Sequence, residues 1–584
     1  MRQPLVLAAG AALAAPLAFA GPAQAETVQY TVTPLKFTVR AGDRACTVDA
    51  DLYRPEGVDA AHPAPAVLAT NGFGGSKSDG STDAIGKAFA ARGYVGLVYS
   101  GLGFGKSGCL ITLDDPAVDG KAASGLLDFL AGTRAADDGT EADYVTKDGA
   151  GDPRVGMIGG SYGGAVQMAT AAVDRRVDAL VPLITWNDLG YALAPNNTGA
   201  RQGVSSDTPG VFKWQWTNGF YLMGEGQPLL NPSLDPSRFG NLTCLHFAAR
   251  ACDTIRLLNS GRYPRDEADA MLAYARSVSP ASYLGRVEAP TLLVQGQADS
   301  LFNLNEATAT YKTLKAQGTT TKMIWQSWGH SGGQVPGELN LGEGNLETSY
   351  VGQRVLAWFD RYLQKKDTDT GPEFSYYRDW QSGYGTAGAV PALSQKMYLS
   401  GDGKLVDNRS KVARGSRQYS NWLVPTSHSE SSLAGLIGLP DPAPYDTKGT
   451  YLGWTSAPLT APVDVVGAPK ATLKVVSPAT ERVQNSRDAS DKLVLFAKVY
   501  DVAPDGTRKL VNRLVSPVRV PDVTRPFTVD LPGIVHRYAT GHRIEFAIAA
   551  SDTAYFGNRG IKPVTVVSAP EDTGVLELPV VPAG

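Results

Sequence analysis

The sequence predicts an α/β protein whose mostly parallel sheet is interrupted by a helical insertion and followed by a separate all-β domain. Between residues 64 and 184, short apolar runs alternate with helical segments, which indicates parallel strands covered by helices on both faces. Residues 187–283 break this alternation with clustered aromatic residues and short helical runs. Beyond about residue 370, short alternating strands punctuated by Pro, Gly and Asp predict a β-sandwich or jelly roll.

The first α/β section accounts for most of the expected parallel sheet. Residues 28–55 alternate and carry turn residues, as antiparallel strands do, and the parallel pattern begins after them. A further βα unit follows the insertion, and a long amphipathic helix over 349–363 closes this part. The expected strands are 64–69, 94–99, 154–158, 177–184, 291–294 and 322–325, and the expected helices are 83–92, 121–130, 165–173, 266–276 and 306–316.

The chain is too long for one core, since its 584 residues exceed the usual domain size of about 100–200 residues. Its net charge of −3 offers no basic surface for nucleic acid. In the β-rich part the expected strands are 396–399, 471–475, 493–500, 527–531 and 543–549. We expect a signal peptide (1–25), an α/β domain (26–186 and 284–368), a helical cap (187–283) and a C-terminal β domain (369–584).

The first 25 residues have the features of an export signal. Met1 and Arg2 precede an apolar, Ala-rich run, and Ala23-Gln24-Ala25 supplies an A-x-A cleavage site. A membrane anchor is the alternative, because the uncharged run is long enough, but the cleavage site favours removal after Ala25. No later stretch is apolar enough to span a bilayer. We therefore expect a secreted, extracellular chain that has no membrane association after cleavage.

Export would place the four cysteines in an oxidising compartment. Cys244 and Cys252 could close a small loop, which leaves Cys46 and Cys109 for a second bridge. Four cysteines allow three pairings, and buried free thiols remain an alternative.

The strongest chemical motif is Gly159-Gly160-Ser161-Tyr162-Gly163, which fits G-x-S-x-G. An apolar strand precedes it and a helix follows it, which is the context of a nucleophile elbow. In that turn the serine hydroxyl is exposed at the carboxyl edge of the sheet, next to the free N–H groups of a helix N-terminus. Ser161 is therefore the expected nucleophile.

A serine nucleophile needs a base, and the base needs an acid that orients it. His330 lies in a loop directly after a predicted strand, whereas His246 lies in the insertion between two cysteines. Asp299 ends the turn after the strand over 291–294, and its position satisfies the chain order Ser, Asp, His of this elbow type. We expect His330 as base and Asp299 as acid, in preference to Asp188, Asp266, Asp269 and Glu306.

Two N–H donors should stabilise the oxyanion. One is the backbone N–H of Tyr162, which follows the nucleophile, and the other is a backbone N–H near Phe73 in the loop Asn71-Gly72-Phe73-Gly74-Gly75. The glycines at 103, 105 and 108 imitate a dinucleotide motif, but no clear helix or ribose-binding acid follows them. No Cys/His cluster has metal-ligand spacing, so we expect neither a metal nor a cofactor.

With these residues in place, the chain resembles the Xaa-Pro dipeptidyl-peptidase family (S15), which includes cocaine-esterase-like and α-amino-acid ester hydrolases. The elbow, the turn Asp299-Ser300-Leu301-Phe302, the loop Trp328-Gly329-His330 and the closing β domain carry the resemblance. It implies an α/β-hydrolase core with an inserted helical cap and a C-terminal jelly roll, and acyl-enzyme chemistry without a cofactor. Family members commonly add a tyrosine hydroxyl to the oxyanion hole from the loop after the third strand, but the loop Asn71-Gly72-Phe73-Gly74 of this chain has no tyrosine.

The resemblance implies a peptide or a small ester or amide as substrate. Our first expectation is release of N-terminal Xaa-Pro dipeptides, with a carboxylesterase or an amide or β-lactam acylase as alternatives. A catalytically silent glycan- or protein-binding module is an alternative of another class, and the oligomeric state stays open. An aminopeptidase needs an anion for the substrate ammonium, for which Asp188, Asp207 and Glu225 are candidates. Candidates for the pocket wall are Trp186, Trp214, Trp216 and Trp328.

Overall fold

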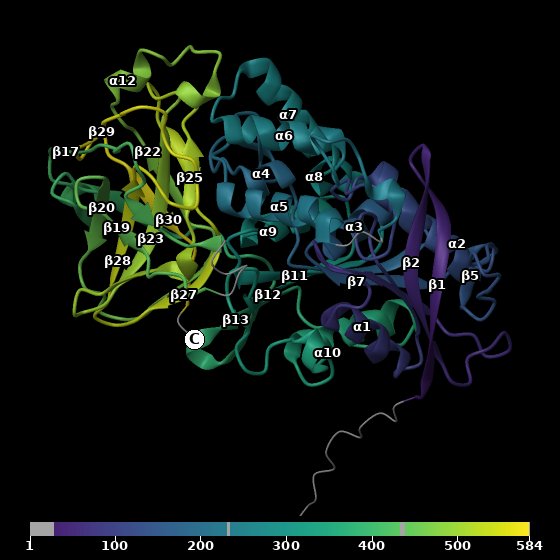
Figure 1. Ribbon diagram of the computed structural model, residues 1–584. Helices are drawn as coiled ribbons and strands as arrows, with labels where there is room; N and C mark the ends of the chain where they lie inside the picture. Colours follow the sequence, from purple (N-terminus) through teal and green to yellow (C-terminus); the bar gives the residue numbers. More distant parts are fainter. Residues whose placement is uncertain (1–27, 231–233, 433–438, 583–584) are drawn as a thin grey trace, which may run out of the picture.

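The computed structural model describes residues 28–230, 234–432 and 439–582 (Figure 1). The expected signal peptide therefore lies outside the described residues. Figure 1 shows the α/β part beside the β-rich part, with the inserted helices α4 to α8 above the carboxyl edge of the first sheet. Within the described ranges, no helix has the length and apolar character needed to cross a membrane.

The first sheet contains ten strands in the order β1-β2-β4-β3-β7-β8-β11-β12-β13-β14. Strands β1 and β2 form an antiparallel hairpin, and β2 also runs antiparallel to β4. The strands from β4 to β13 pair in parallel, and β14 returns antiparallel at the far edge. Their bounds are β1 (Tyr30–Ala41), β2 (Arg44–Pro55), β3 (Ala66–Thr70), β4 (Val95–Tyr99), β7 (Val155–Gly160), β8 (Val177–Leu183), β11 (Thr291–Ala298), β12 (Thr321–Trp328), β13 (Phe374–Arg378) and β14 (Gly383–Ala387).

Helices cover both faces of this sheet, which is why its central strands β3 and β4 are buried along their whole length. Phe129 and Met168, from α2 and α3, belong to the core on one face. Phe89 and Trp358, from α1 and α10, belong to the core on the other face. The helices of this domain are α1 (Gly80–Ala90), α2 (Lys121–Leu130), α3 (Tyr162–Ala171), α9 (Leu304–Ala316) and α10 (Tyr350–Tyr362).

The chain between β8 and β11 forms the inserted helical segment. It contains a disulfide between Cys244 and Cys252, and a second disulfide joins Cys46 of β2 to Cys109. A small ribbon of β9 and β10 precedes its longest helix. The elements are α4 (Leu189–Leu193), β9 (Ala200–Gln202), β10 (Ser205–Ser206), α5 (Trp214–Leu230), α6 (Ala249–Ser260), α7 (Arg265–Ser277) and α8 (Pro280–Tyr283).

The C-terminal part is rich in β-strands and has its own apolar core, which includes Trp454 and Phe546. Its large sheet follows the order β24-β23-β28-β20-β16-β15-β30-β22-β26. The strands of this part are β15 (Gln395–Leu399), β16 (Lys404–Val406), β17 (Gly415–Tyr419), β18 (Ser427–His428), β19 (Tyr445–Asp446), β20 (Tyr451–Ser456), β21 (Val463–Gly467), β22 (Lys470–Leu473), β23 (Val494–Val502), β24 (Arg508–Leu510), β25 (Ser516–Arg519), β26 (Phe527–Asp530), β27 (Ile534–Tyr538), β28 (Arg543–Ala549), β29 (Val564–Ser568), β30 (Val575–Leu578) and β31 (Val580–Val581).

The boundary between the two parts differs from the one expected at residue 368. Strands β13 and β14 lie beyond that position, yet they extend the first sheet through pairing with β12. Their sequences alternate like those of the β-rich part, and only the pairing partner assigns them to the α/β sheet. The first sheet therefore continues beyond α10 and ends with β14.

Candidate active site

Ser161 occupies the turn between β7 and α3, with backbone angles φ 56° and ψ −120°. A positive φ is unfavourable for a residue with a side chain, so the surrounding turn must hold it. The flanking glycines allow the close packing that does so. A Cβ atom at Gly163 would lie 2.4 Å from the carbonyl oxygen of Thr70, and one at Gly159 would lie 2.7 Å from the oxygen of Gly163. The G-x-S-x-G pattern thus has a steric cause in this structure.

The structure brings Ser161, His330 and Asp299 into one hydrogen-bonded chain. His330 lies in the loop after β12, and its Nε2 atom is 3.0 Å from Ser161 Oγ. Its Nδ1 atom is 2.7 Å from Oδ2 of Asp299, which follows β11. The Asp299 side chain is completely buried, and its Oδ1 accepts a hydrogen bond of 2.7 Å from the backbone N–H of Phe302. Both carboxylate oxygens are therefore paired, and the imidazole is held between acid and hydroxyl.

The alternative residues have other partners. His246 is buried in the inserted segment, between the carbonyl oxygens of Arg238 and Gly103, and burial lowers its pKa. Glu306, on α9, accepts the backbone N–H groups of Asn187 and Asp188. Burial raises the pKa of Glu306 to about 8.

Backbone N–H groups of two segments beside Ser161 lack an acceptor among the described residues. Tyr162 is the first residue of α3, where an N–H has no partner within the helix. The N–H groups of Phe73 and of its neighbours Gly72 and Gly74, in the loop after β3, also lack an acceptor among the described residues. That loop lies against the serine, since a Cβ atom at the neighbouring Gly72 would be 3.9 Å from Ser161 Cβ. The assignment of Tyr162 and Phe73 to an oxyanion hole stays a prediction.

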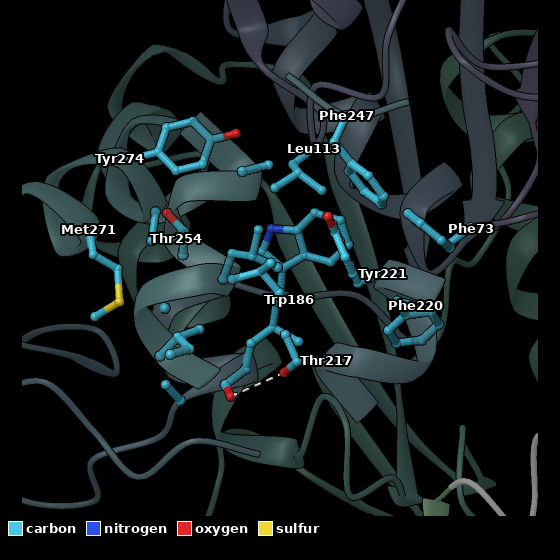
Figure 2. A pocket seen from close by; sticks show the side chains of 18 of the residues that line it. Phe73, Leu113, Trp186, Thr217, Phe220, Tyr221, Phe247, Thr254, Met271 and Tyr274 are labelled. Carbon is cyan, nitrogen blue, oxygen red and sulfur yellow. Dashed lines mark hydrogen bonds between the residues drawn. The ribbon is translucent and has the colours of Figure 1, made fainter. Parts of the chain in front are cut away.

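A cavity of about 110 Å³ opens beside Ser161, beneath the inserted helices (Figure 2). The rings of Phe73, Phe220 and Phe247 stand on one side of it and Tyr274 on the other, as Figure 2 shows. None of its described lining residues carries a charge. Trp186 and Tyr274 are two of the lining residues, and Trp186 Nε1 and the Tyr274 hydroxyl are buried without an acceptor among the described residues.

The four predicted wall tryptophans divide between the cavity and other places. Trp186 lines the cavity. Trp216 lies beside the base, with its ring centre 6.2 Å from that of His330. Trp214 instead donates its Nε1 hydrogen to the carbonyl of Thr553 at 2.8 Å, in the β-rich domain. Trp328, at the end of β12, is not among the residues that line the cavity.

None of the three carboxylates proposed for an ammonium lines the cavity. Asp188 caps α4 and accepts the N–H of Gly190 at 2.7 Å, so the helix terminus rather than a ligand occupies it. Asp207 pairs with Arg201 and Arg276. Glu225 accepts backbone N–H groups of the loop that precedes α6, at 2.8 and 3.0 Å.

Four residues near the site were given no role in the sequence analysis. Ser300 and Ser331 directly follow Asp299 and His330, and their hydroxyl oxygens are 2.5 Å apart. Lys213, just before α5, donates to the carbonyl of Ser300 at 2.6 Å, and burial lowers its pKa to about 8. Glu430 reaches Ser300 from the β-rich domain. Their adjacency depends on domain packing, which no local pattern reports.

Comparison with known proteins assigns both parts of the chain. Residues 43–332 match the family described as X-Pro dipeptidyl-peptidase (S15 family). Residues 360–566 match the family described as the X-Pro dipeptidyl-peptidase C-terminal non-catalytic domain. Putative serine esterases of Mycobacterium bovis and Mycobacterium tuberculosis are each 25% identical over 323 residues, which cover 48% of this chain and 48% of each relative. The chain thus spans about half the length of the curated relatives it matches.

Three solved structures share the fold over nearly the whole chain. An aminopeptidase from a marine-sediment Thaumarchaeota archaeon has a TM-score of 0.65 at 15% identity and covers 96% of this chain and 98% of its own. An α-amino acid ester hydrolase has a TM-score of 0.64 at 16% identity, with 97% and 99% covered. A CocE/NonD family hydrolase of Staphylococcus aureus has a TM-score of 0.57 at 12% identity, with 95% and 97% covered.

At these identities the three solved structures show the fold alone. The family is identified by the two family matches, over residues 43–332 and 360–566. The matches cover the α/β domain and the β-rich domain in the order in which the structure joins them. The chain belongs to the X-Pro dipeptidyl-peptidase (S15) family of serine hydrolases.

Proposed function

We propose that this protein hydrolyses carboxylic esters whose acyl group is small and apolar, through an acyl-enzyme on Ser161. The observation that carries this proposal is the uncharged cavity of about 110 Å³ that Ser161 itself helps to line. A dry, apolar cavity of about 150 Å³ suffices for a benzene ring. The cavity beside Ser161 is smaller than that, so it suits a short acyl group, would hold a single ring only if its walls moved apart, and is too small for a long fatty-acyl chain.

In the proposed mechanism, His330 Nε2 takes the Ser161 proton while Oγ attacks the ester carbonyl. Asp299 holds the imidazole with Nε2 facing the serine and stabilises the imidazolium that forms. The backbone N–H groups of Tyr162 and Phe73 bind the oxyanion of the tetrahedral intermediate. His330 then protonates the leaving alcohol, and a water molecule activated by the same base releases the acid.

The two unpaired donors refine the substrate class. A buried N–H or O–H without a partner costs free energy, which a substrate acceptor would recover. An acyl group with an ether or carbonyl oxygen at its far end would place that oxygen toward Trp186 Nε1 and the Tyr274 hydroxyl. Such substrates should be preferred over purely hydrocarbon analogues of the same size.

Release of Xaa-Pro dipeptides remains the second candidate, and the family membership favours it. The apolar cavity suits a proline ring, but a free substrate N-terminus would also need a carboxylate. Asp188, Asp207 and Glu225 are each engaged elsewhere. An uncharged acyl group avoids this requirement, which is why we rank ester hydrolysis first.

Export from the cell belongs to the same proposal. Two disulfides among the described residues support an oxidising compartment. If residues 1–25 are removed as expected, the mature protein begins at Glu26. Mass spectrometry of the protein recovered from culture medium tests this, and an intact Met1 terminus in the cell fraction would contradict it.

The first test compares the wild type with Ser161→Ala on 4-nitrophenyl acetate, butyrate, phenylacetate and octanoate, and on a Gly-Pro arylamide. We expect turnover of the small esters, at least tenfold lower kcat/KM for octanoate, and loss of about 10³-fold or more in the variant. Turnover of the arylamide in preference to the esters would establish the peptidase instead. Folded wild-type protein that turns over nothing and resists a fluorophosphonate would favour a binding module.

A cavity variant supplies a matched control for substrate choice. Ala275 is buried in α7 and lines the cavity, so Ala275→Leu would fill it without touching Ser161. We expect kcat/KM for phenylacetate to fall at least tenfold while that for acetate stays within about threefold. Equal losses for both esters would place the acyl group elsewhere.

A further inference from the structure

A carboxylate of the β-rich domain contacts the turn that carries the proposed acid. Glu430 follows β18 and is only 4% exposed. Its Oε2 accepts a hydrogen bond from Ser300 Oγ at 2.5 Å, and its Oε1 accepts from Trp216 Nε1 and Ser432 Oγ, each at 3.3 Å. A buried carboxylate without donors would be costly, so these contacts account for its presence in the interface.

Hydrogen bonds continue from the turn that contains Asp299 and Ser300 (the acid turn) to the loop that contains His330 and Ser331 (the base loop). Ser300 Oγ is 2.5 Å from Ser331 Oγ, which also accepts the Ser300 N–H at 3.1 Å. The N–H of Ser331 donates to the carbonyl of Ala298 at 3.2 Å, so the two loops are joined in both directions. Because Ser300 follows Asp299 and Ser331 follows His330, one side chain of the β-rich domain is linked to both proposed catalytic loops.

The inserted segment holds the same turn from the opposite side. Lys213 Nζ donates to the carbonyls of Ser300 and Leu301, at 2.6 and 3.2 Å. Trp216, on the following helix turn, donates to Glu430 and packs edge-on against His330. Burial raises the pKa of Glu430 and lowers that of Lys213, while attraction between the two opposes both changes. The acid turn is thus held by groups from two other parts of the chain.

We propose that Glu430 is a positioning residue. Through Ser300 and Ser331 it holds Asp299 and His330 in position relative to Ser161. The β-rich domain would then take part in catalysis without touching substrate. This inference rests on the proposed roles of Ser161, His330 and Asp299. A misplacement of about 1 Å among catalytic groups can lower the rate about 100-fold. A link through the residues directly after Asp299 and His330 can therefore affect the rate.

The experiment compares Glu430→Ala and Glu430→Gln in the full chain, with the best ester found for the wild type. We expect Glu430→Ala to lower kcat and the rate of fluorophosphonate labelling at least tenfold, with KM within about twofold. Glu430→Gln keeps an oxygen that accepts the Ser300 hydroxyl, so it should recover kcat to within about threefold of wild type. Thermal unfolding of each variant identifies losses due to unfolded protein.

Asn305→Ala is the matched control, because Asn305 also joins the two domains. It donates to the carbonyl of Leu531 and accepts the N–H of Gly533, both at 3.0 Å, away from the triad. It should lower stability and leave kcat within about twofold. A loss of kcat equal to that of Glu430→Ala would overturn the proposal, since any interface defect would then suffice.

Ser331→Ala covers the case in which Glu430→Ala fails to fold, because Ser331 is exposed and its removal leaves Glu430 in place. It should lower kcat about threefold or more, and the double variant should lose less than the product of the single losses. Unchanged kcat in Ser331→Ala, or fully multiplicative losses, would contradict the link. Ser161→Ala runs in parallel: if it retains turnover, the proposed function fails, whereas its inactivity beside a fully active Glu430→Ala overturns only this inference.

Discussion

At the scale of single residues, the site depends on a serine whose backbone conformation is unfavourable by itself. Holding a side-chain-bearing residue at φ 56° costs on the order of 1–3 kcal/mol, which the packing of the turn must offset. That packing works only because glycines allow β7, α3 and the loop after β3 to approach closely. The hydroxyl is exposed as a result, where His330 can reach it.

Substitution of one of these glycines should therefore damage folding as well as catalysis. Gly163→Ala would place Cβ 2.4 Å from one backbone oxygen and 3.0 Å from another, and neither can move without shifting β3. We expect about 1–3 kcal/mol of destabilisation in urea unfolding and at least tenfold lower kcat.

Gly226→Ala is the control for this substitution. Gly226 lies within α5, and a Cβ there would meet no atom within 4 Å. Alanine favours helix over glycine by up to about 1 kcal/mol, so this variant should be as stable as wild type or more stable. If both alanines have the same effect, the steric account of Gly163 is wrong.

At the scale of elements, the carboxyl ends of β7, β11 and β12 meet at one edge of the sheet and bring the three proposed catalytic residues together. The inserted segment lies over this edge and shapes the cavity. Each disulfide acts on a different element: one fastens the β1–β2 hairpin to the loop after β4, and the other closes a short loop at α6.

The two disulfides should therefore contribute unequally to stability. They span 63 and 8 residues, and the entropy of closing those loops predicts about 4 and about 2.5 kcal/mol. Replacing Cys46 and Cys109 with Ala should lower the free energy of unfolding more than replacing Cys244 and Cys252. Urea unfolding of the two double variants measures this, and a larger loss at the short loop would show that native contacts dominate over loop entropy.

At the scale of the whole molecule, buried ionisable groups lie where the domains and the inserted segment meet. Glu306 is completely buried on α9, where it accepts two backbone N–H groups from the start of the insertion, and both Asp188 and Lys213 lie near it. Such groups make folding depend on pH because burial favours their neutral forms.

The contribution of Glu306 to stability should consequently fall as the pH rises above about 4.5. The pKa of Glu306 is about 8 in the folded protein against an ordinary 4.5, so the folded state retains a proton that the unfolded chain releases. Its contribution is complete below pH 4.5 and is lost progressively up to about pH 8, by a few kcal/mol. Glu306→Gln should reduce this slope between about pH 5 and 7.5, measured by urea unfolding of both proteins. An unchanged slope would mean that Glu306 is ionised in the folded state.

The sequence by itself determined the α/β sheet, the elbow and the loops that carry Asp299 and His330. These features are local: apolar runs of strand length, glycines beside a serine, and polar residues directly after a strand. Parallel strands then bring such positions together, because all their carboxyl ends lie at the same edge. The order of the residues along the chain selected them, from several acids and two histidines, as the candidates that the structure then brings into one hydrogen-bonded chain.

Only the tertiary structure decided what surrounds these residues. Asp188 caps a helix, Trp214 faces the β-rich domain, and β13 joins the first sheet, although their sequences fit other roles equally well. Glu430 meets Ser300 across 130 positions of chain, in a contact that depends on how two domains pack. Hydrophobic periodicity reports which face of an element is buried, but it carries no information about which distant element covers that face. The cavity beside Ser161 and the contacts of Glu430 and Lys213 with Ser300 both depend on which element that is.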